Sequence, residues 1–78
     1  MNATPFDFDA ERREDGSIDL SRIFREHRRG MAKTRGYLLA MSYLERVEHY
    51  RPIRSRQVAA SVLAMADTLY SLGEEKLS

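Results

Sequence analysis

The sequence contains no cysteine and only two histidines, His27 and His49. Without cysteine the chain has neither a disulfide bond nor a thiolate site for a metal ion. Two histidines are too few to form a dedicated metal cluster on their own. No apolar run is long enough to predict a segment that spans a membrane, and the first residues lack the apolar core of a secretory signal. We therefore expect a cytoplasmic protein with no metal and no cofactor.

The chain is also short. Its 78 residues can form at most one small domain, and a chain of this size buries only about 60% of its unfolded surface. A lone monomer would therefore be marginally stable. Domains this small usually rely on a disulfide bond, a bound metal ion or a partner chain. With 42% hydrophobic and 32% charged residues, the composition is nevertheless that of a folding chain rather than of a disordered one.

The formal net charge of +1 conceals a separation of acidic from basic residues along the chain. Residues 1–21 carry six acidic side chains and two arginines, whereas residues 22–35 carry six basic side chains and one acid, Glu26. We expect the acidic segment to pair with the basic one, within a chain or across a dimer. The alternative is that both segments are simply solvated surfaces.

Residues 1–16 are predicted to form a flexible acidic arm, and residues 17–78 a single helical domain. The pair Asp15-Gly16 is typical of a turn. Phe6 and Phe8 alternate with aspartates, as in a short extended segment. The two phenylalanines are therefore candidates for docking into an apolar groove of a partner. The alternative is a tether that packs on its own domain.

Apolar residues recur at helical spacing over residues 20–41, with alternating steps of four and three residues as in a coiled coil. The helical pattern ends before Pro52, which cannot continue a helix. Gly30 and Gly36 interrupt it, because each costs roughly 1 kcal/mol relative to alanine inside a helix. We favour one long helix over residues 18–50, kinked near the glycines, because the seam keeps its phase. The alternative is two helices separated by a break at Gly30.

The C-terminal segment is predicted to be a helix that begins after Ser55 and ends at Gly73, the usual position of a capping glycine. Its apolar residues form two adjoining stripes, and no charged residue occurs over residues 57–66. A helix that is apolar on most sides is buried by several neighbours. The short connection over residues 51–54 predicts an antiparallel hairpin of the two helices.

A two-helix hairpin gives the last helix only one neighbour, so part of its apolar circumference would face water. Each Leu or Val left exposed forgoes roughly 1.5–3 kcal/mol, and several such residues exceed what a chain this short holds in reserve. We therefore predict an all-α helical hairpin that forms a homodimer with a four-helix core. A three-helix monomer is the alternative. The predicted dimer core consists of Leu38, Met41, Leu44, Val58, Val62, Met65 and Leu69.

No enzyme motif is recognisable in the sequence. The segment GMAKTRG has two glycines but lacks the Gly-Lys-Ser/Thr ending of a phosphate-binding loop, and no serine lies in a nucleophile-elbow pattern. Glu45, Glu48 and His49 do not have the three-residue Glu–His spacing of a di-iron helix, so we expect ordinary surface ion pairs there. We predict a protein without catalytic residues and without a small-molecule substrate.

The basic segment is the one group of residues with a functional interpretation. On a helix its cations share one face, where they could follow the phosphates of a nucleic acid or pair with the carboxylates of a protein. We favour a protein partner, because the acidic arm offsets the positive field and no helix-turn-helix pattern is present. Tyr43 lies away from the seam and is a further candidate contact. The predicted partner-binding residues are Arg22, Arg25, Arg28, Arg29, Lys33, Arg35, Tyr43, Phe6 and Phe8.

Three segments together give the chain a characteristic layout. They are an acidic start, MNATPFDFDAERRED, a basic helix, SRIFREHRRGMAKTR, and an alanine-rich closing helix, RQVAASVLAMADTLYSL. In size and layout the chain resembles the small helical early proteins of bacteriophages that bind and inhibit host regulators, quorum-sensing anti-activators among them. The resemblance implies a dimeric helical adaptor that blocks a partner's surface, and it identifies no individual functional residue.

We therefore expect a regulatory protein–protein interaction module that binds a partner protein and modulates or inhibits it. A small dimeric protein that binds nucleic acid through its basic helix face is the alternative. We expect no binding to membranes, because the apolar face of the helices is already used by the bundle.

Overall fold

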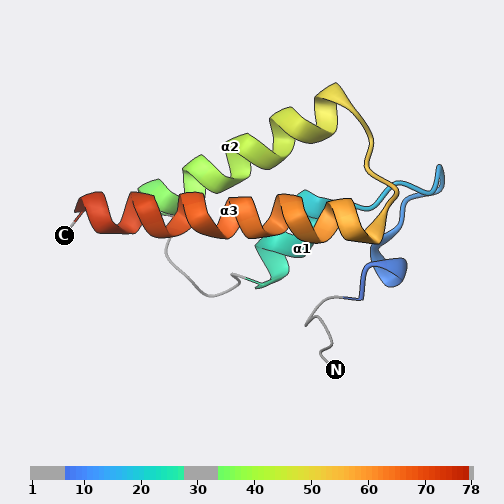
Figure 1. Cartoon of the computed structure of the whole chain (residues 1–78), viewed down its shortest axis with the longest axis horizontal. Coiled ribbons are helices and arrows are strands. Elements are labelled where there is room, and N and C mark those ends of the chain that lie inside the picture. Colours follow the sequence, from blue (N-terminus) through green and yellow to red (C-terminus); the bar gives the residue numbers. More distant parts are fainter. Residues whose placement is uncertain (1–6, 28–33, 78) are drawn as a thin grey trace.

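The computed structural model describes residues 7–27 and 34–77, with the backbone alone for residues 74–77. Within these ranges the chain is all-helical, which confirms the predicted all-α class. A short 3₁₀ helix, η1 (Asp9–Glu11), precedes three α-helices (Figure 1). The α-helices are α1 (Leu20–His27), α2 (Arg35–Tyr50) and α3 (Arg56–Leu77).

The prediction of one continuous helix over residues 18–50 is wrong. α1 ends at His27, and Thr34 has an extended backbone (φ −84°, ψ 176°) that an α-helix does not contain. The Thr34 hydroxyl accepts a hydrogen bond from the Tyr37 amide at 3.2 Å and so caps the start of α2. Thr34 lies four residues before Leu38 and so fits the alternating spacing of the predicted seam, although it is a capping residue outside the helix. Gly30 itself lies outside the described residues.

The start of α2 meets the end of α3, and the two antiparallel helices diverge from this point (Figure 1). Gly36 and Gly73 are in contact there. A Cβ built on Gly36 would lie 2.9 Å from the Tyr70 carbonyl carbon, and one built on Gly73 would lie 2.5 Å from the Gly36 nitrogen. Only glycine permits backbones to approach this closely. Gly73 therefore has a packing role inside α3, and the prediction that it ends the helix is wrong.

The N-terminal segment packs against the connection between α2 and α3. The Ile18 amide donates a hydrogen bond to the Ile53 carbonyl at 2.7 Å, and the Arg12 guanidinium donates one to the Arg54 carbonyl at 2.9 Å. Gly16 makes the intervening turn with a positive φ of 89°, a conformation that favours glycine. These contacts join the segment to the helical body.

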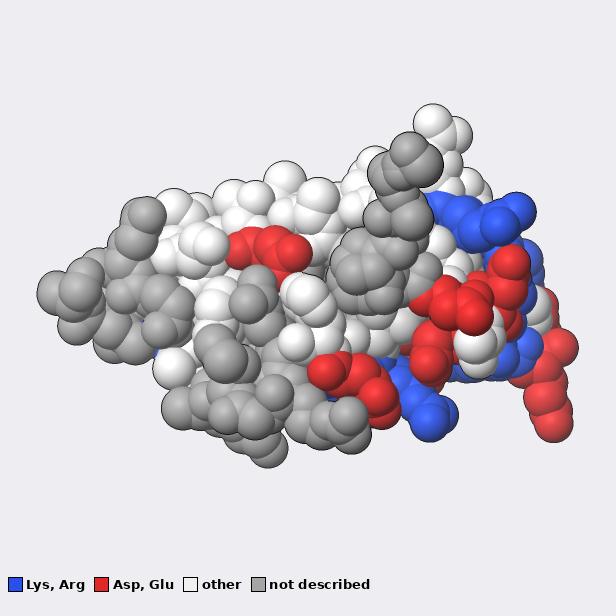
Figure 2. Space-filling view, turned by 90° about the horizontal axis from the view of Figure 1, so that it is seen from below, with Lys and Arg blue, Asp and Glu red and all other residues white. Residues whose placement is uncertain are grey.

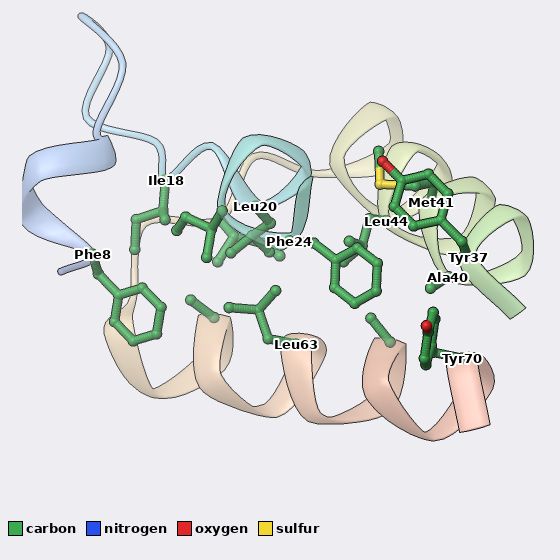
Figure 3. Close-up of a cluster of buried hydrophobic side chains, with 14 residues drawn as sticks. Phe8, Ile18, Leu20, Phe24, Tyr37, Ala40, Met41, Leu44, Leu63 and Tyr70 are labelled. Carbon is green, nitrogen blue, oxygen red and sulfur yellow. The ribbon is translucent and has the colours of Figure 1, made fainter. Parts of the chain in front are cut away.

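Phe8 is only 5% exposed and belongs to the hydrophobic core (Figure 3). The sequence predicted a flexible arm over residues 1–16. In the structure, residues 7–16 instead pack on the helices, and the Phe8 ring is buried there. Phe8 is therefore not available to a partner, and its prediction as a partner-binding residue is wrong. Phe6 lies outside the described residues.

The core lies between α3 on one side and α1 with α2 on the other (Figure 3). The Phe24 ring of α1 joins all three helices, since its centroid is 6.0 Å from that of Tyr37 on α2 and 6.4 Å from that of Tyr70 on α3. The buried face of α3 repeats at steps of four and three residues, as helical packing requires. This face consists of Ala59, Leu63, Ala66 and Tyr70.

Glu48 of α2 caps the N-terminus of α1. The Leu20 amide and the Ser21 hydroxyl each donate a hydrogen bond to one of its carboxylate oxygens at 2.8 Å, and the Arg13 guanidinium lies 3.4 Å away. The Glu48 side chain is 11% exposed, so the predicted surface ion pair is instead a nearly buried cap. An eight-residue helix is too short to be stable alone, and the negative charge at its N-terminus stabilises it.

Candidate protein-interaction surface

An apolar groove opens where α2 and α3 diverge. Its volume is about 480 Å³, which lies within the range of about 300–1,000 Å³ typical of binding sites. Ile53 is buried, whereas most of the other apolar side chains are half-buried at its walls. The groove is lined by Tyr43, Arg46, Val47, Tyr50, Arg51, Ile53, Val58 and Val62.

The α2 wall of the groove is one face of that helix. Tyr43, Val47 and Tyr50 follow one another at steps of four and three residues, which places them on the same side. Glu48, which reaches α1, lies on a different side. The groove and α1 are therefore on different sides of α2. Tyr50 is 88% exposed, so its ring projects from the end of α2 into solvent.

α3 carries a second apolar row next to its buried face, and we call this row the α3 stripe. Three of its residues, Val58, Met65 and Leu72, are each 48% exposed. The stripe continues the groove along α3, because two of its residues also line the groove. The complete α3 stripe is Val58, Val62, Met65, Leu69 and Leu72.

The residues of the predicted dimer core do not lie on one surface, since some are buried and others are exposed. Met41 and Leu44 are buried within a single chain, so in this structure they are not exposed to a second chain. Leu38 is 58% exposed, but it lies on a different side of α2 from Tyr43. All the remaining predicted core residues belong to the α3 stripe. These are Val58, Val62, Met65 and Leu69.

The predicted basic face is only partly placed. Arg22, Arg25 and Arg35 are exposed on α1 and α2. The Arg22 guanidinium lies 3.4 Å from the Glu11 carboxylate and 4.0 Å from that of Glu26. The pairing of the acidic segment with the basic one is therefore confirmed for this contact within one chain. The remaining residues of the predicted face, Arg28, Arg29 and Lys33, lie outside the described residues.

Charged side chains gather at the end of the molecule where the N-terminal segment lies, on the right of Figure 2. Basic and acidic groups alternate there. The Asp9 carboxylate is 3.1 Å from the Arg12 guanidinium and 3.4 Å from that of Arg56. At the turn, the Ser17 hydroxyl and amide donate hydrogen bonds to the Asp15 carboxylate at 2.7 and 2.9 Å, and these bonds lower the pKa of Asp15.

Other kinds of site are not evident in the part of the chain that the structure describes. No three His, Asp or Glu side chains there are placed so that they could hold a metal ion. None of the helices in that part combines the length and the apolar character needed to cross a bilayer. Tyr43, predicted as an outside contact, does line the groove. The groove itself was not predicted, although the spacing of Tyr43, Val47 and Tyr50 is visible in the sequence.

No protein-family model, curated protein or solved structure matches this chain. The groove and the α3 stripe share Val58 and Val62 and so form one continuous apolar surface on the molecule.

Proposed function

We propose that the chain is a non-catalytic protein–protein interaction module, which binds a partner protein through the groove and the α3 stripe and thereby modulates or inhibits that partner. The α3 stripe is the observation that carries the proposal. Five apolar side chains repeat along the outside of a helix whose other apolar face is already buried in the core. Single exposed apolar residues are common, but a contiguous apolar patch usually marks a contact surface.

The energy available at this surface is substantial for so small a protein. Burying a half-exposed Val, Met or Leu contributes about half of the 1.5–3 kcal/mol that full burial gives. Covering the three stripe residues that are 48% exposed therefore contributes about 2–4 kcal/mol. A small domain has a total stability of about 5–15 kcal/mol, so a bound partner would change the stability of the chain measurably.

The lining of the groove has the composition of an interface. Tyrosine and arginine are enriched among the residues that dominate binding between proteins, and the groove contains two of each beside four aliphatic side chains. The proposed contact surface is therefore the groove with the α3 stripe, and not the basic helix. Arg22 of that helix is already paired within the chain, and nucleic-acid binding would need a basic surface that is free to meet phosphates.

A second copy of the chain is a further candidate for covering the α3 stripe. The stripe has no charged neighbour over residues 57–66, and a two-fold axis would place two antiparallel stripes against each other. The homodimer would then be built without Met41 and Leu44. Sedimentation velocity tests this arrangement. A dimer should dissociate on Met65→Asp, and a stable particle of 9.1 kDa at high micromolar concentration would exclude the dimer.

The proposed function is tested by partner capture with matched variants. The tagged chain, Met65→Asp and Leu38→Asp are each incubated with cell extract, and captured proteins are quantified by mass spectrometry. Both variants place one aspartate at an exposed apolar position, but Leu38 lies off the groove and the stripe. We expect Leu38→Asp to retain the captured protein and Met65→Asp to lose it, with both variants folded by circular dichroism. Capture that survives Met65→Asp unchanged would refute the proposal.

A further inference from the structure

We propose that the groove binds an amphipathic helix of a partner protein in which carboxylate side chains flank the apolar residues. This inference rests on the proposed function and specifies the chemistry of the partner. The groove combines an apolar lining with charge of one sign only. Arg46 and Arg51 are its charged lining residues, and no acidic residue lines it among those that the structure describes.

The two arginines of the groove are available to a partner. Both are exposed, and within the described residues neither forms an ion pair. The arginines of the N-terminal segment differ, because Arg12 and Arg13 lie 3.1 and 2.9 Å from the carboxylates of neighbouring aspartates. The C-terminal end of a helix favours cations, which accounts for a basic charge near the end of α2. It does not account for a lining without a carboxylate among the described residues.

A guanidinium group beside an apolar surface selects a carboxylate. Arginine presents a rigid fork of donors that matches the two oxygens of a carboxylate. Such a pair is stronger when apolar contacts exclude water from it. A partner that places aliphatic or aromatic side chains against Val47 and Val58 would bring its flanking residues to Arg46 and Arg51. Acidic residues at those flanking positions would pair with the two guanidinium groups.

A helix is the form of partner that fits the shape of the surface. The groove lies between two helices, and it continues into the α3 stripe beyond Val62. A helix with apolar residues at steps of three and four would enter the groove with one turn and contact Met65 with a later turn. It would pack along α3 on the side that the chain's own helices leave uncovered.

A two-fold dimer that pairs the α3 stripes or the grooves of two copies does not supply the same chemistry. The α3 stripe of the second copy has no acidic residue over residues 57–66. Its groove presents the same two arginines, so two grooves facing each other across a two-fold axis would place like charges together. The charge of the groove therefore favours another protein as its occupant.

A displayed peptide library tests the inference. The peptides are helices of about 16 residues, or about four turns, with Leu and Phe fixed along one face and the flanking positions varied among Glu, Lys and Gln. They are selected on the immobilised full chain and sequenced. We expect Glu to be enriched over Lys at the flanking positions by about tenfold, as a charge-assisted pair produces. Enrichment of Lys, an absence of charge preference or a failure to select any peptide would overturn the inference.

Two charge-reversed variants identify the residues responsible. The double variant Arg46→Glu/Arg51→Glu should select Lys instead of Glu. The matched control, Arg25→Glu/Arg35→Glu, changes the net charge by the same amount at exposed positions away from the groove, and it should still select Glu. A preference for Glu that survives Arg46→Glu/Arg51→Glu would also overturn the inference.

The failure of this inference and the failure of the proposed function are distinguishable. If partner capture depends on Met65 but is unchanged in Arg46→Glu/Arg51→Glu, the proposed function stands and an acidic helix is excluded. If no peptide is selected and Met65→Asp dissociates a dimer, the occupant of the surface is a second copy and the inference is wrong. If capture does not depend on Met65, the proposed function itself is wrong.

Discussion

Replacing Gly36 with alanine should destabilise the protein, although alanine is the better helix former. At an open helix position this change stabilises by about 1 kcal/mol. At position 36 the new Cβ would lie 2.9 Å from the carbonyl carbon of Tyr70 and 3.1 Å from its Cα. These are backbone atoms, so no side-chain rotation relieves the overlap, and α2 and α3 must move apart.

The expected loss of stability depends on where this contact lies in the structure. Overpacking a closely packed site costs about 1–3 kcal/mol and sometimes more. Separating the helices at Gly36 also disturbs Tyr37 and Tyr70, whose rings pack against Phe24 in the core. The overlap involves backbone atoms, which places the cost near the upper end of this range, so subtracting the gain of about 1 kcal/mol in helix propensity leaves an expected net loss of about 2 kcal/mol. For a domain of this size, that loss lowers Tm by about 8–16 °C.

Urea denaturation followed by far-UV circular dichroism measures this loss. Ser71→Ala is the matched control, because Ser71 is exposed on α3 close to the same crossing. It removes no packing contact that Gly36 makes, and it should leave the stability unchanged or raise it by a few tenths of a kcal/mol. If Gly36→Ala were as stable as the wild type, or more stable, the close approach of α2 and α3 at this glycine would be refuted.

Two further predictions concern the caps and turns. Glu48→Ala should lower the free energy of unfolding by about 1–3 kcal/mol, because the Leu20 amide and the Ser21 hydroxyl lose a charged acceptor; an unchanged urea midpoint would contradict this. Asp15→Asn should reduce stability most above pH 3.8, the ordinary pKa of the carboxyl. The difference should shrink as the pH falls through the lowered pKa of folded Asp15, because both states then bind the proton. A difference that stays constant in denaturation curves at acid pH would argue against it.

Helical periodicity predicted the all-α class and the start of α3 after Ser55, but it missed the separation of α1 from α2 and did not show which side of α3 packs inside. Both rows of α3 repeat at steps of four and three residues, so their spacing gives no preference. The contact between Gly36 and Gly73 requires the backbones of α2 and α3 to approach closely. The row with small residues, Ala59 and Ala66, therefore faces the core, and the bulkier row that includes Met65 remains outside.

Contacts between distant parts of the chain were beyond the reach of the sequence pattern. Glu48 caps a helix that begins 28 residues earlier, and its own neighbours in sequence give no sign of this. Phe8 was predicted to be available because its neighbours are aspartates, yet the ring is buried while Asp7 and Asp9 remain exposed. Local spacing indicates which face a residue occupies, but it does not indicate which distant segment covers that face.

Three residues of the α3 stripe, Val58, Met65 and Leu72, are each 48% exposed and do not belong to the core that the described residues form. Polar residues at positions 58, 65 and 72 would leave the buried row of α3 in place, because helical periodicity puts the two rows on different sides of the helix. Such residues would also make the surface less prone to association. The stripe is nevertheless built of Val, Met and Leu. It adjoins a groove whose two arginines form no ion pair, and which no carboxylate lines, among the described residues. A contact surface for another protein would have these properties. Met41 and Leu44 are buried within one chain, yet α3 still has more apolar surface than the described part of its own chain covers.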